Sequence, residues 1–148
     1  MCSFTPLFFL LFLSPSLFAV SWEIIGQDSK FPVHNGNVEV SLNQSCGEVT
    51  IQILKNKKIP YIGNAAGINS ILGTPTGSAS ISKISEHSMR VYGWCYEVDG
   101  VQPNVMPDKC YFKSTSSHLL WFFAFSLFDK GEWKEFCIPA HLHPLKNL

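Results

Sequence analysis

The most constraining feature of this chain is residues 118–128, a run that is almost wholly apolar. Its centre, residues 119–125, has no polar side chain at either of the two alternating sets of positions. A strand with one face in water alternates apolar and polar residues, so this run predicts a central strand that is covered on both faces. The segment around 62–71, a partner or a ligand must then cover the second face.

Period-two alternation predicts further strands. Residues 38–42 and 49–53 alternate around turn residues at 43–47, which predicts a hairpin. Residues 89–98 predict another strand, which breaks at Asp99-Gly100 and resumes near 110–112. The apolar run turns at 129–131 and continues as a strand over 132–138.

The remaining segments are less regular. Residues 22–36 have a mixed, loop-like sequence, and 60–72 suit a short crossover helix that Gly63 and Gly67 weaken. These elements predict an α+β fold with a mostly antiparallel or mixed β-sheet and one short crossover helix.

The N-terminus resembles a secretory leader. Residues 7–20 form an apolar stretch of about 14 residues, shorter than the roughly 20 that a membrane-spanning helix needs. Small residues at 19 and 21 favour cleavage before Trp22, with the Ala19–Val20 bond as the other candidate. No Lys or Arg precedes the stretch, so an uncleaved anchor is the alternative. We therefore expect a signal peptide at 1–21 and a single domain at 22–148, exported to the periplasm or the extracellular space, without a stable membrane span after cleavage.

Four cysteines follow the leader: Cys46, Cys95, Cys110 and Cys137. An even number in an exported chain favours two disulfides, and four cysteines allow three pairings. We favour Cys95 with Cys110, because both flank the turn-rich segment 98–107, which leaves Cys46 with Cys137. A zinc site is the competing interpretation.

The charge balance excludes some partners. Lys plus Arg and Asp plus Glu number 11 each, and none lies in residues 1–21. A neutral domain has no strong attraction for nucleic acid or an anionic membrane, so we expect no nucleic-acid partner.

Aromatic residues give the candidate binding surface. Trp94 and Tyr96 would share one face of their strand, and Trp121 and Phe123 would do likewise on the neighbouring strand. An open face would stack a ligand or a protein, whereas a covered face would be a buried aromatic core.

Residues 64–139 resemble a bacterial family of small exported domains of unknown function, related to the C-terminal domain of transcobalamin and intrinsic factor. The matching positions are Gly93, Trp94, Tyr96, Val98 and Gly100. The resemblance implies a β-grasp-like fold. Cobalamin binding is not carried over, because the vitamin carriers need a much larger helical domain that this chain lacks, and we expect no cofactor.

These observations favour a non-catalytic exported module that binds an unknown small molecule or protein. One alternative is an enzyme or accessory subunit with site residues in the segments 59–77 and 99–109, although no nucleophile motif is present. The other is a metal-binding domain that uses His141 and His143, which are spaced to bind a metal but lie in a tail with no adjacent carboxylate.

Overall fold

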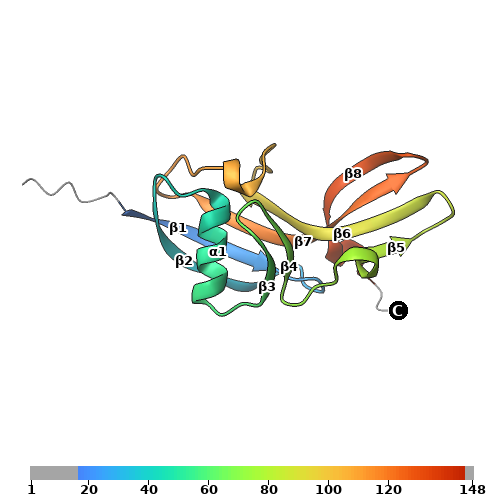
Figure 1. Cartoon of the computed structure of the whole chain (residues 1–148), viewed down its shortest axis with the longest axis horizontal. Coiled ribbons are helices and arrows are strands. Elements are labelled where there is room, and N and C mark those ends of the chain that lie inside the picture. The colour runs from blue at the N-terminus through green and yellow to red at the C-terminus, as the bar shows by residue number, and fades with distance from the viewer. Residues whose placement is uncertain (1–16, 146–148) are drawn as a thin grey trace, which may run out of the picture.

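The computed structural model describes residues 17–145, which form a curled mixed β-sheet, a separate small hairpin and one α-helix (Figure 1). The large sheet has the order β2-β1-β7-β6-β5, with β8 also paired to β7, and the small one pairs β3 with β4. The bounds are β1 Leu17–Ile25, β2 Pro32–Ser41, α1 Cys46–Asn56, β3 Tyr61–Asn64, β4 Gly67–Ile71, β5 Ile81–Lys83, β6 Ser88–Val98, β7 His118–Asp129 and β8 Glu132–Pro139. Three 3-10 turns, Gly77–Ser80, Pro107–Lys109 and Ala140–Leu142, complete the described elements.

Strand β7 is the centre of the large sheet. One of its edges pairs antiparallel with β6 along the whole length, from Ser88↔Asp129 to Val98↔Leu119. Its other edge pairs in parallel with β1 over residues 118–122 and then antiparallel with β8 from Ala124 onward. The central strand predicted from the apolar run is confirmed.

The helix α1 begins with a capping box and packs against one face of the sheet. The Ser45 hydroxyl accepts a hydrogen bond from the Glu48 backbone N–H (3.2 Å), and the Glu48 carboxylate accepts one from the Ser45 N–H (2.8 Å). Val49, Ile53 and their neighbours on one side of the helix are buried. The Trp121 indole of β7 donates to the Thr50 hydroxyl (2.9 Å), which satisfies two buried polar groups and joins helix to sheet.

The prediction of a mostly β fold with a mixed sheet and one helix is confirmed, but the helix lies elsewhere than predicted. Residues 49–53, predicted as a strand, belong to α1, because Val49 and Ile53 also fit the i, i+4 spacing of a helix face and Ser45 supplies the cap. Residues 60–72, predicted as the helix, form the β3–β4 hairpin instead. Gly63 adopts φ 138°, which a helix does not allow.

Two further segments differ from the prediction. Residues 22–36, predicted to be loop-like, contribute to the β1–β2 hairpin, which pairs Trp22 with Gly36. Residues 110–112 form no strand; only an isolated bridge joins Tyr111 to Ser45. The sequence signal for β2 is weak because its first half does not follow the alternation of burial: Val33 is exposed, whereas His34 and Gly36 lie on the more covered face.

Most of the predicted leader lies outside the described residues. The part within them, 17–21, is the first half of β1 and pairs with residues 37–41 of β2. The side chains of Phe18 and Val20 are buried in the core, so these residues contribute to the folded domain.

The capping box predicts a pH-dependent contribution of Glu48 to stability. Hydrogen bonds from the Ser45 backbone and hydroxyl lower the pKa of Glu48 below its ordinary value. A lowered folded-state pKa stabilises the fold above the unfolded-state pKa, and that contribution is lost as the pH falls through the folded-state pKa. We expect Glu48→Gln to reduce the urea midpoint at pH 7 and to approach the wild-type midpoint near pH 3. Glu86→Gln, in a turn, is the control; an equal Glu48→Gln deficit at both pH values contradicts the prediction.

Candidate functional site

The end of the sheet farthest from α1 carries a row of side chains that crosses four strands. Lys83 of β5 pairs with Met89 of β6, Met89 pairs with Phe128 of β7, and Phe128 pairs with Trp133 of β8. Directly paired residues project from the same face of a sheet, so the four side chains form one continuous band. Three of them are apolar, and the band ends in an ammonium group at the β5 edge.

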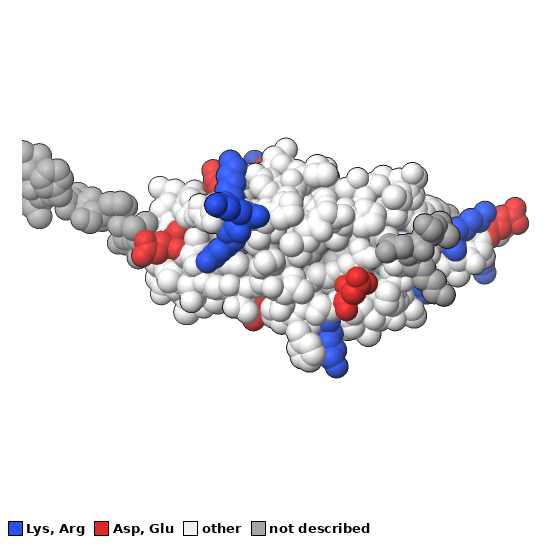
Figure 2. Space-filling model, turned by 90° about the horizontal axis from the view of Figure 1, so that it is seen from below, with Lys and Arg blue, Asp and Glu red and all other residues white. Residues whose placement is uncertain are grey.

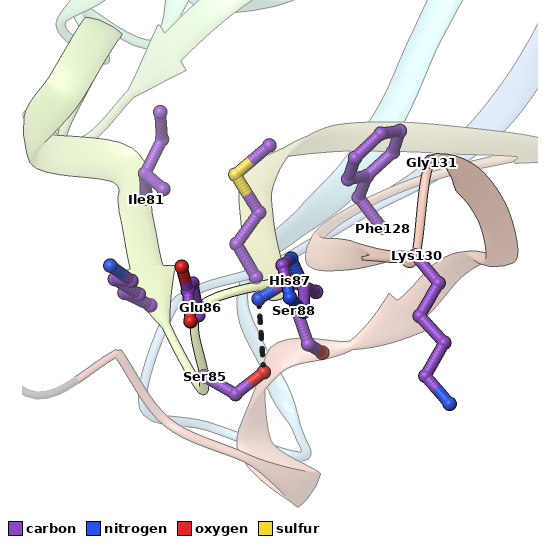
Figure 3. A pocket seen from close by; sticks show the side chains of 10 residues that line it. Ile81, Ser85, Glu86, His87, Ser88, Phe128, Lys130 and Gly131 are labelled. Atoms are coloured by element: carbon purple, nitrogen blue, oxygen red, sulfur yellow. Dashed lines mark hydrogen bonds between the residues drawn. The ribbon is translucent and has the colours of Figure 1, made fainter.

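A cavity of about 560 Å³ opens over this band, between the β5–β6 turn and the β7–β8 turn (Figure 3). We call it the hairpin cleft. In Figure 3, Ile81 and Phe128 lie on opposite sides, with the β5–β6 turn between them. The lining residues are Ile81, Lys83, Ser85, Glu86, His87, Ser88, Met89, Phe128, Lys130 and Gly131. Its volume lies within the roughly 300–1,000 Å³ that small-molecule sites occupy.

The charged groups of the hairpin cleft come from the two turns. Lys83 and Lys130 contribute two cations, and Glu86 contributes one carboxylate. The turns are held together because the backbone N–H of Lys130 donates to the carbonyl of His87 (2.8 Å). Within the β5–β6 turn, the Ser85 hydroxyl accepts a hydrogen bond from the His87 N–H (3.3 Å). Because the two lysines outnumber the one carboxylate, the lining has a net positive charge.

A second, smaller cavity of about 260 Å³ lies beside the cleft, and we call it the aromatic slot. Gly93 and Ala124, which pair across β6 and β7, form part of its lining. A Cβ at Gly93 would meet no atom within 4 Å, so the space above it is open. Trp133 and Phe136 of β8 also line the slot and are 46% and 63% exposed. The Trp133 ring lies 5.2 Å from that of Phe128, which links slot and cleft.

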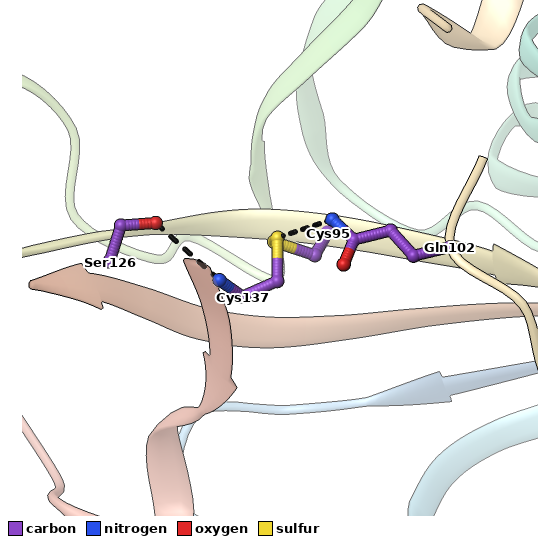
Figure 4. The surroundings of a disulfide bond; sticks show 4 residues. All are labelled: Cys95, Gln102, Ser126 and Cys137. Atoms are coloured by element: carbon purple, nitrogen blue, oxygen red, sulfur yellow. Dashed lines mark hydrogen bonds between the residues drawn. A yellow bond between two sulfur atoms is a disulfide. The ribbon is translucent and has the colours of Figure 1, made fainter. Parts of the chain in front are cut away.

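The disulfide Cys95–Cys137 shapes the slot by curling the sheet (Figure 4). In sheet order β7 lies between β6 and β8, so their backbones would be about 9.6 Å apart in a flat sheet. The Cα atoms of the two cysteines are only 5.9 Å apart, so β8 folds toward β6. Figure 4 shows Gln102 donating to the Cys137 sulfur (2.9 Å), and the Cys137 N–H donating to the Ser126 hydroxyl (3.4 Å).

This bond corrects the predicted pairing. Cys95 with Cys110 and Cys46 with Cys137 are both wrong, because Cys95 is bonded to Cys137. Cys46 and Cys110 are buried thiols. The prediction treated 98–107 as a hairpin that joins two strands, whereas the chain turns tightly at Asp99-Gly100 and residues 101–109 leave the sheet.

Three of the four predicted stacking residues are buried. The register pairs Trp94 with Phe123 and Tyr96 with Trp121, so the four side chains lie on one face of the sheet. Tyr96, Trp121 and Phe123 are buried in the core on that face. The Tyr96 hydroxyl donates to the Val105 carbonyl (2.7 Å), and burial raises the Tyr96 pKa well above its ordinary value. Through the Tyr96–Val105 and Trp121–Thr50 hydrogen bonds, these residues hold the segment 101–109 and α1 against the sheet.

Trp94 is half-buried and differs from its neighbours. Its indole N–H donates to the Thr74 hydroxyl (2.8 Å), and its ring lies 5.5 Å from that of Phe123. It lines the aromatic slot and also a cavity of about 420 Å³ beside Asn69 and Thr76. Trp94 is therefore the predicted stacking residue that lies at a cavity surface.

The other positions of the sequence motif end the strand. Val98 exchanges two backbone hydrogen bonds with Val101 (2.9 and 3.1 Å) around a two-residue turn. Asp99 and Gly100 in that turn have φ 55° and 74°, a conformation that favours an Asp-Gly pair. The break predicted at this pair is confirmed.

The two segments in which an enzyme's site residues could lie, 59–77 and 99–109, border separate cavities. Residues 62–77 border the 420 Å³ cavity, and 99–109 border one of about 440 Å³ that includes Asp99 and Lys109. Neither lining joins an acid, an imidazole and a hydroxyl. The hairpin cleft contains all three kinds of group, but among its described contacts no hydrogen bond joins the Glu86 carboxylate, the His87 imidazole and a serine hydroxyl to one another.

Ser21, His118 and Glu23 form an acid–imidazole–hydroxyl cluster outside these cavities. The Ser21 hydroxyl lies 2.9 Å from His118 Nδ1, and His118 Nε2 lies 3.7 Å from the Glu23 carboxylate. A serine nucleophile also needs backbone N–H donors for an oxyanion. The N–H of Ser21 donates to the Ser117 carbonyl (3.2 Å) and that of His118 donates to Asp99 (2.7 Å), so both are occupied. The cluster joins β1 to β7.

The two tail histidines lie apart from any acidic group that could complete a metal site. His141 belongs to the turn Ala140–Leu142, and the exposed His143 lies with its ring 5.7 Å from that of Phe125. Across residues 17–145, no three His, Cys, Asp or Glu side chains are grouped closely enough to hold a metal ion.

Charged side chains are sparse on the face that Figure 2 shows, where small groups of both signs are separated by uncharged surface. No large surface of one sign is present on this face, as expected for a neutral chain. Among the described residues, no helix has the length and apolar character needed to cross a membrane.

The exposure of Trp133 predicts that iodide in solution can quench its fluorescence. Trp22 and Trp121 are buried and Trp94 is half-buried, whereas Trp133 is 46% exposed, so we expect Trp133→Phe to remove the largest part of the fluorescence that iodide quenches. Trp121→Phe is the matched control, which should reduce total emission but preserve the quenchable part. An unchanged iodide-accessible fraction in Trp133→Phe would contradict the open slot.

Comparison with solved structures finds one described as a "putative metal binding protein" from Ruminococcus gnavus ATCC 29149. The likeness covers 70% of this chain and 95% of that chain, at 14% sequence identity and a TM-score of 0.41. No family model and no curated protein matches the chain. At this identity and TM-score, the likeness does not identify what the chain binds.

Proposed function

We propose that this chain is an exported, non-catalytic binding module whose ligand occupies the hairpin cleft. The observation that carries the proposal is the cleft itself: about 560 Å³, floored by Met89 and Phe128 and bordered by charged turn residues. Small-molecule sites combine a mainly apolar lining with a few polar groups that orient the ligand.

The chemistry of the lining suggests the ligand class. An apolar body would contact Ile81, Met89 and Phe128, and an anionic group would be attracted to Lys83 and Lys130. Glu86 offsets one of these two cations, so a single negative charge suits the site better than several. We therefore propose a small amphipathic anion, such as an aromatic or aliphatic carboxylate.

We favour a binding role over catalysis because the acid, imidazole and hydroxyl groups do not make the hydrogen bonds that a catalytic set needs. In the hairpin cleft these groups are not linked through their side chains, and in the Ser21 cluster the nearest backbone donors are occupied. A general base must contact the proton that it removes, and a nucleophile must contact its base.

The family resemblance remains part of this proposal. A mixed sheet with a helix on one face is compatible with a β-grasp-like fold related to the transcobalamin C-terminal domain. The hairpin cleft lies in the single domain, so the proposed ligand needs no second helical domain, and cobalamin is not proposed.

Export is supported by the Cys95–Cys137 disulfide, because such bonds persist in oxidising compartments.

The position of β1 argues for an earlier cleavage bond than the one favoured by sequence. Cleavage before Trp22 would remove residues 17–21 from β1, with buried Phe18 and Val20. Ser14 and Ser16 place small residues at the two positions that signal peptidase recognises, so we propose cleavage at the Ser16–Leu17 bond.

The binding proposal is tested with 2-naphthoate and its neutral counterpart 2-naphthamide. We expect 2-naphthoate to shift the NMR signals of the Met89 and Ile81 methyl groups and to bind more tightly than 2-naphthamide. Reversing two exposed charges near an anion removes two favourable contacts and creates two repulsive ones. Lys83→Glu/Lys130→Glu should therefore weaken 2-naphthoate binding roughly tenfold in a calorimetric titration.

Lys30→Glu/Lys57→Glu reverses two exposed lysines away from the cleft and should leave binding unchanged. Equal affinity for both probes would refute the preference for an anion. No shift of the Met89 and Ile81 methyl signals with either probe would refute the site.

The cleavage proposal is tested by the intact mass of the protein recovered from the exported fraction. We expect a chain that starts at Leu17, because the first half of β1 belongs to the core. A chain that starts at Trp22 or Val20, or an uncleaved chain, would contradict the assignment.

A further inference from the structure

We infer that Cys46 and Cys110 form a second disulfide, which ties the first turn of α1 to the segment that follows β6. The inference shares with the proposed function only the oxidising compartment. The Cys95–Cys137 bond provides an internal reference for that compartment, so the two proposals can fail separately.

The backbone holds the two cysteines side by side. The N–H of Cys46 donates to the carbonyl of Cys110 (2.8 Å), and Ser45 and Tyr111 form an antiparallel bridge directly beside them. Residues opposite each other in an antiparallel pair have Cα atoms about 4.5–5.5 Å apart, which lies within the range that disulfides span.

The side chains of Cys46 and Cys110 are buried in the same part of the core. Cys46 is 0% and Cys110 8% exposed, and both belong to the main core cluster. After burial of Cys46, the nearby Cys110 thiol is the next cause that raises the pKa of Cys46, as expected for neighbouring side chains. The pair therefore combines a suitable backbone separation with burial in one core cluster.

Oxidation requires a disulfide donor, either a thiol oxidoreductase or a low-mass disulfide. One cysteine thiolate attacks a donor sulfur, the donor S–S bond breaks, and a mixed disulfide forms. The second thiolate then displaces the remaining donor sulfur. The two cysteines lose two protons and two electrons in total, and the donor leaves as two thiols.

Burial of Cys46, and then its contact with Cys110, raises the Cys46 pKa well above its ordinary value. The thiolate is therefore scarce once the domain has folded, and the bond must form before the cysteines are buried. The loop between Cys46 and Cys110 includes β3 to β6, so the bond restricts a large part of the unfolded chain.

Peptide mapping of the secreted protein tests the pairing directly. The protein is alkylated under denaturing conditions without reduction and then digested with trypsin. Cleavage after Lys and Arg places the four cysteines in separate peptides, 31–55, 91–109, 110–113 and 135–146. We expect peptide 31–55 to be linked to peptide 110–113, and 91–109 to 135–146.

Alkylated Cys46 and Cys110 beside an intact Cys95–Cys137 bond would overturn this inference alone. Four alkylated cysteines would overturn it together with the proposed compartment. A link between peptides 91–109 and 110–113 would overturn the pairing in favour of Cys95 with Cys110.

Thermal unfolding provides an independent measurement. The Cys95→Ala/Cys137→Ala variant lacks the other disulfide, so an effect of added reductant on its Tm reports on the Cys46–Cys110 bond. Unfolding and refolding in reductant should then lower the Tm on the order of 10 °C. Adding Cys46→Ala/Cys110→Ala should abolish this sensitivity, and a Tm that reductant does not change in the first background would overturn the bond.

Discussion

The pairing of β7 with three other strands is the interaction on which the rest of the structure depends. Its backbone is bonded to β6 along one edge and to β1 and then β8 along the other. Trp121 and Phe123 project into the core on one face, while Phe122 and Ala124 are buried on the opposite face. A strand this apolar is stable only where both faces leave water, so it fixes both the position of α1 and the curl of β8.

The two ends of β7 differ because they are covered in different ways. At one end α1 packs across the sheet, and the Trp121–Thr50 hydrogen bond satisfies polar groups that burial would otherwise leave unpaired. At the other end residues 17–145 supply no second α-helix, and the cover comes from β8, which Cys137 ties to β6. The curl leaves Trp133 and Phe136 at the surface and the hairpin cleft open between two turns. The candidate site is thus the part of the apolar sheet that the domain's own elements leave uncovered.

The sequence predicted the elements whose pattern has a single interpretation. Residues 89–98, 118–128 and 132–138 are rich in aromatic or β-branched residues, and the turns Asp99-Gly100 and Lys130-Gly131 adopt positive φ. It failed at 49–53, where Val49, Ile51 and Ile53 fit a strand while Val49 and Ile53 fit a helix equally well. The Ser45–Glu48 capping box was the available signal for the helix. Of the predicted stacking residues only Trp94 reaches a cavity, because period two identifies which residues share a face but not which face is covered.

By itself, the sequence determined that the chain builds a mostly β domain around one wholly apolar strand, because local periodicity and turn chemistry are properties of consecutive residues. It also determined that four cysteines lie between residues 46 and 137, but not which of them meet. Only the tertiary structure decided that Cys95 bonds to Cys137, that Cys46 lies opposite Cys110, and that Met89, Phe128 and Trp133 line up across strands. The reason is physical: strand register and the curl of the sheet set these proximities, and both arise from pairing between residues far apart in the chain.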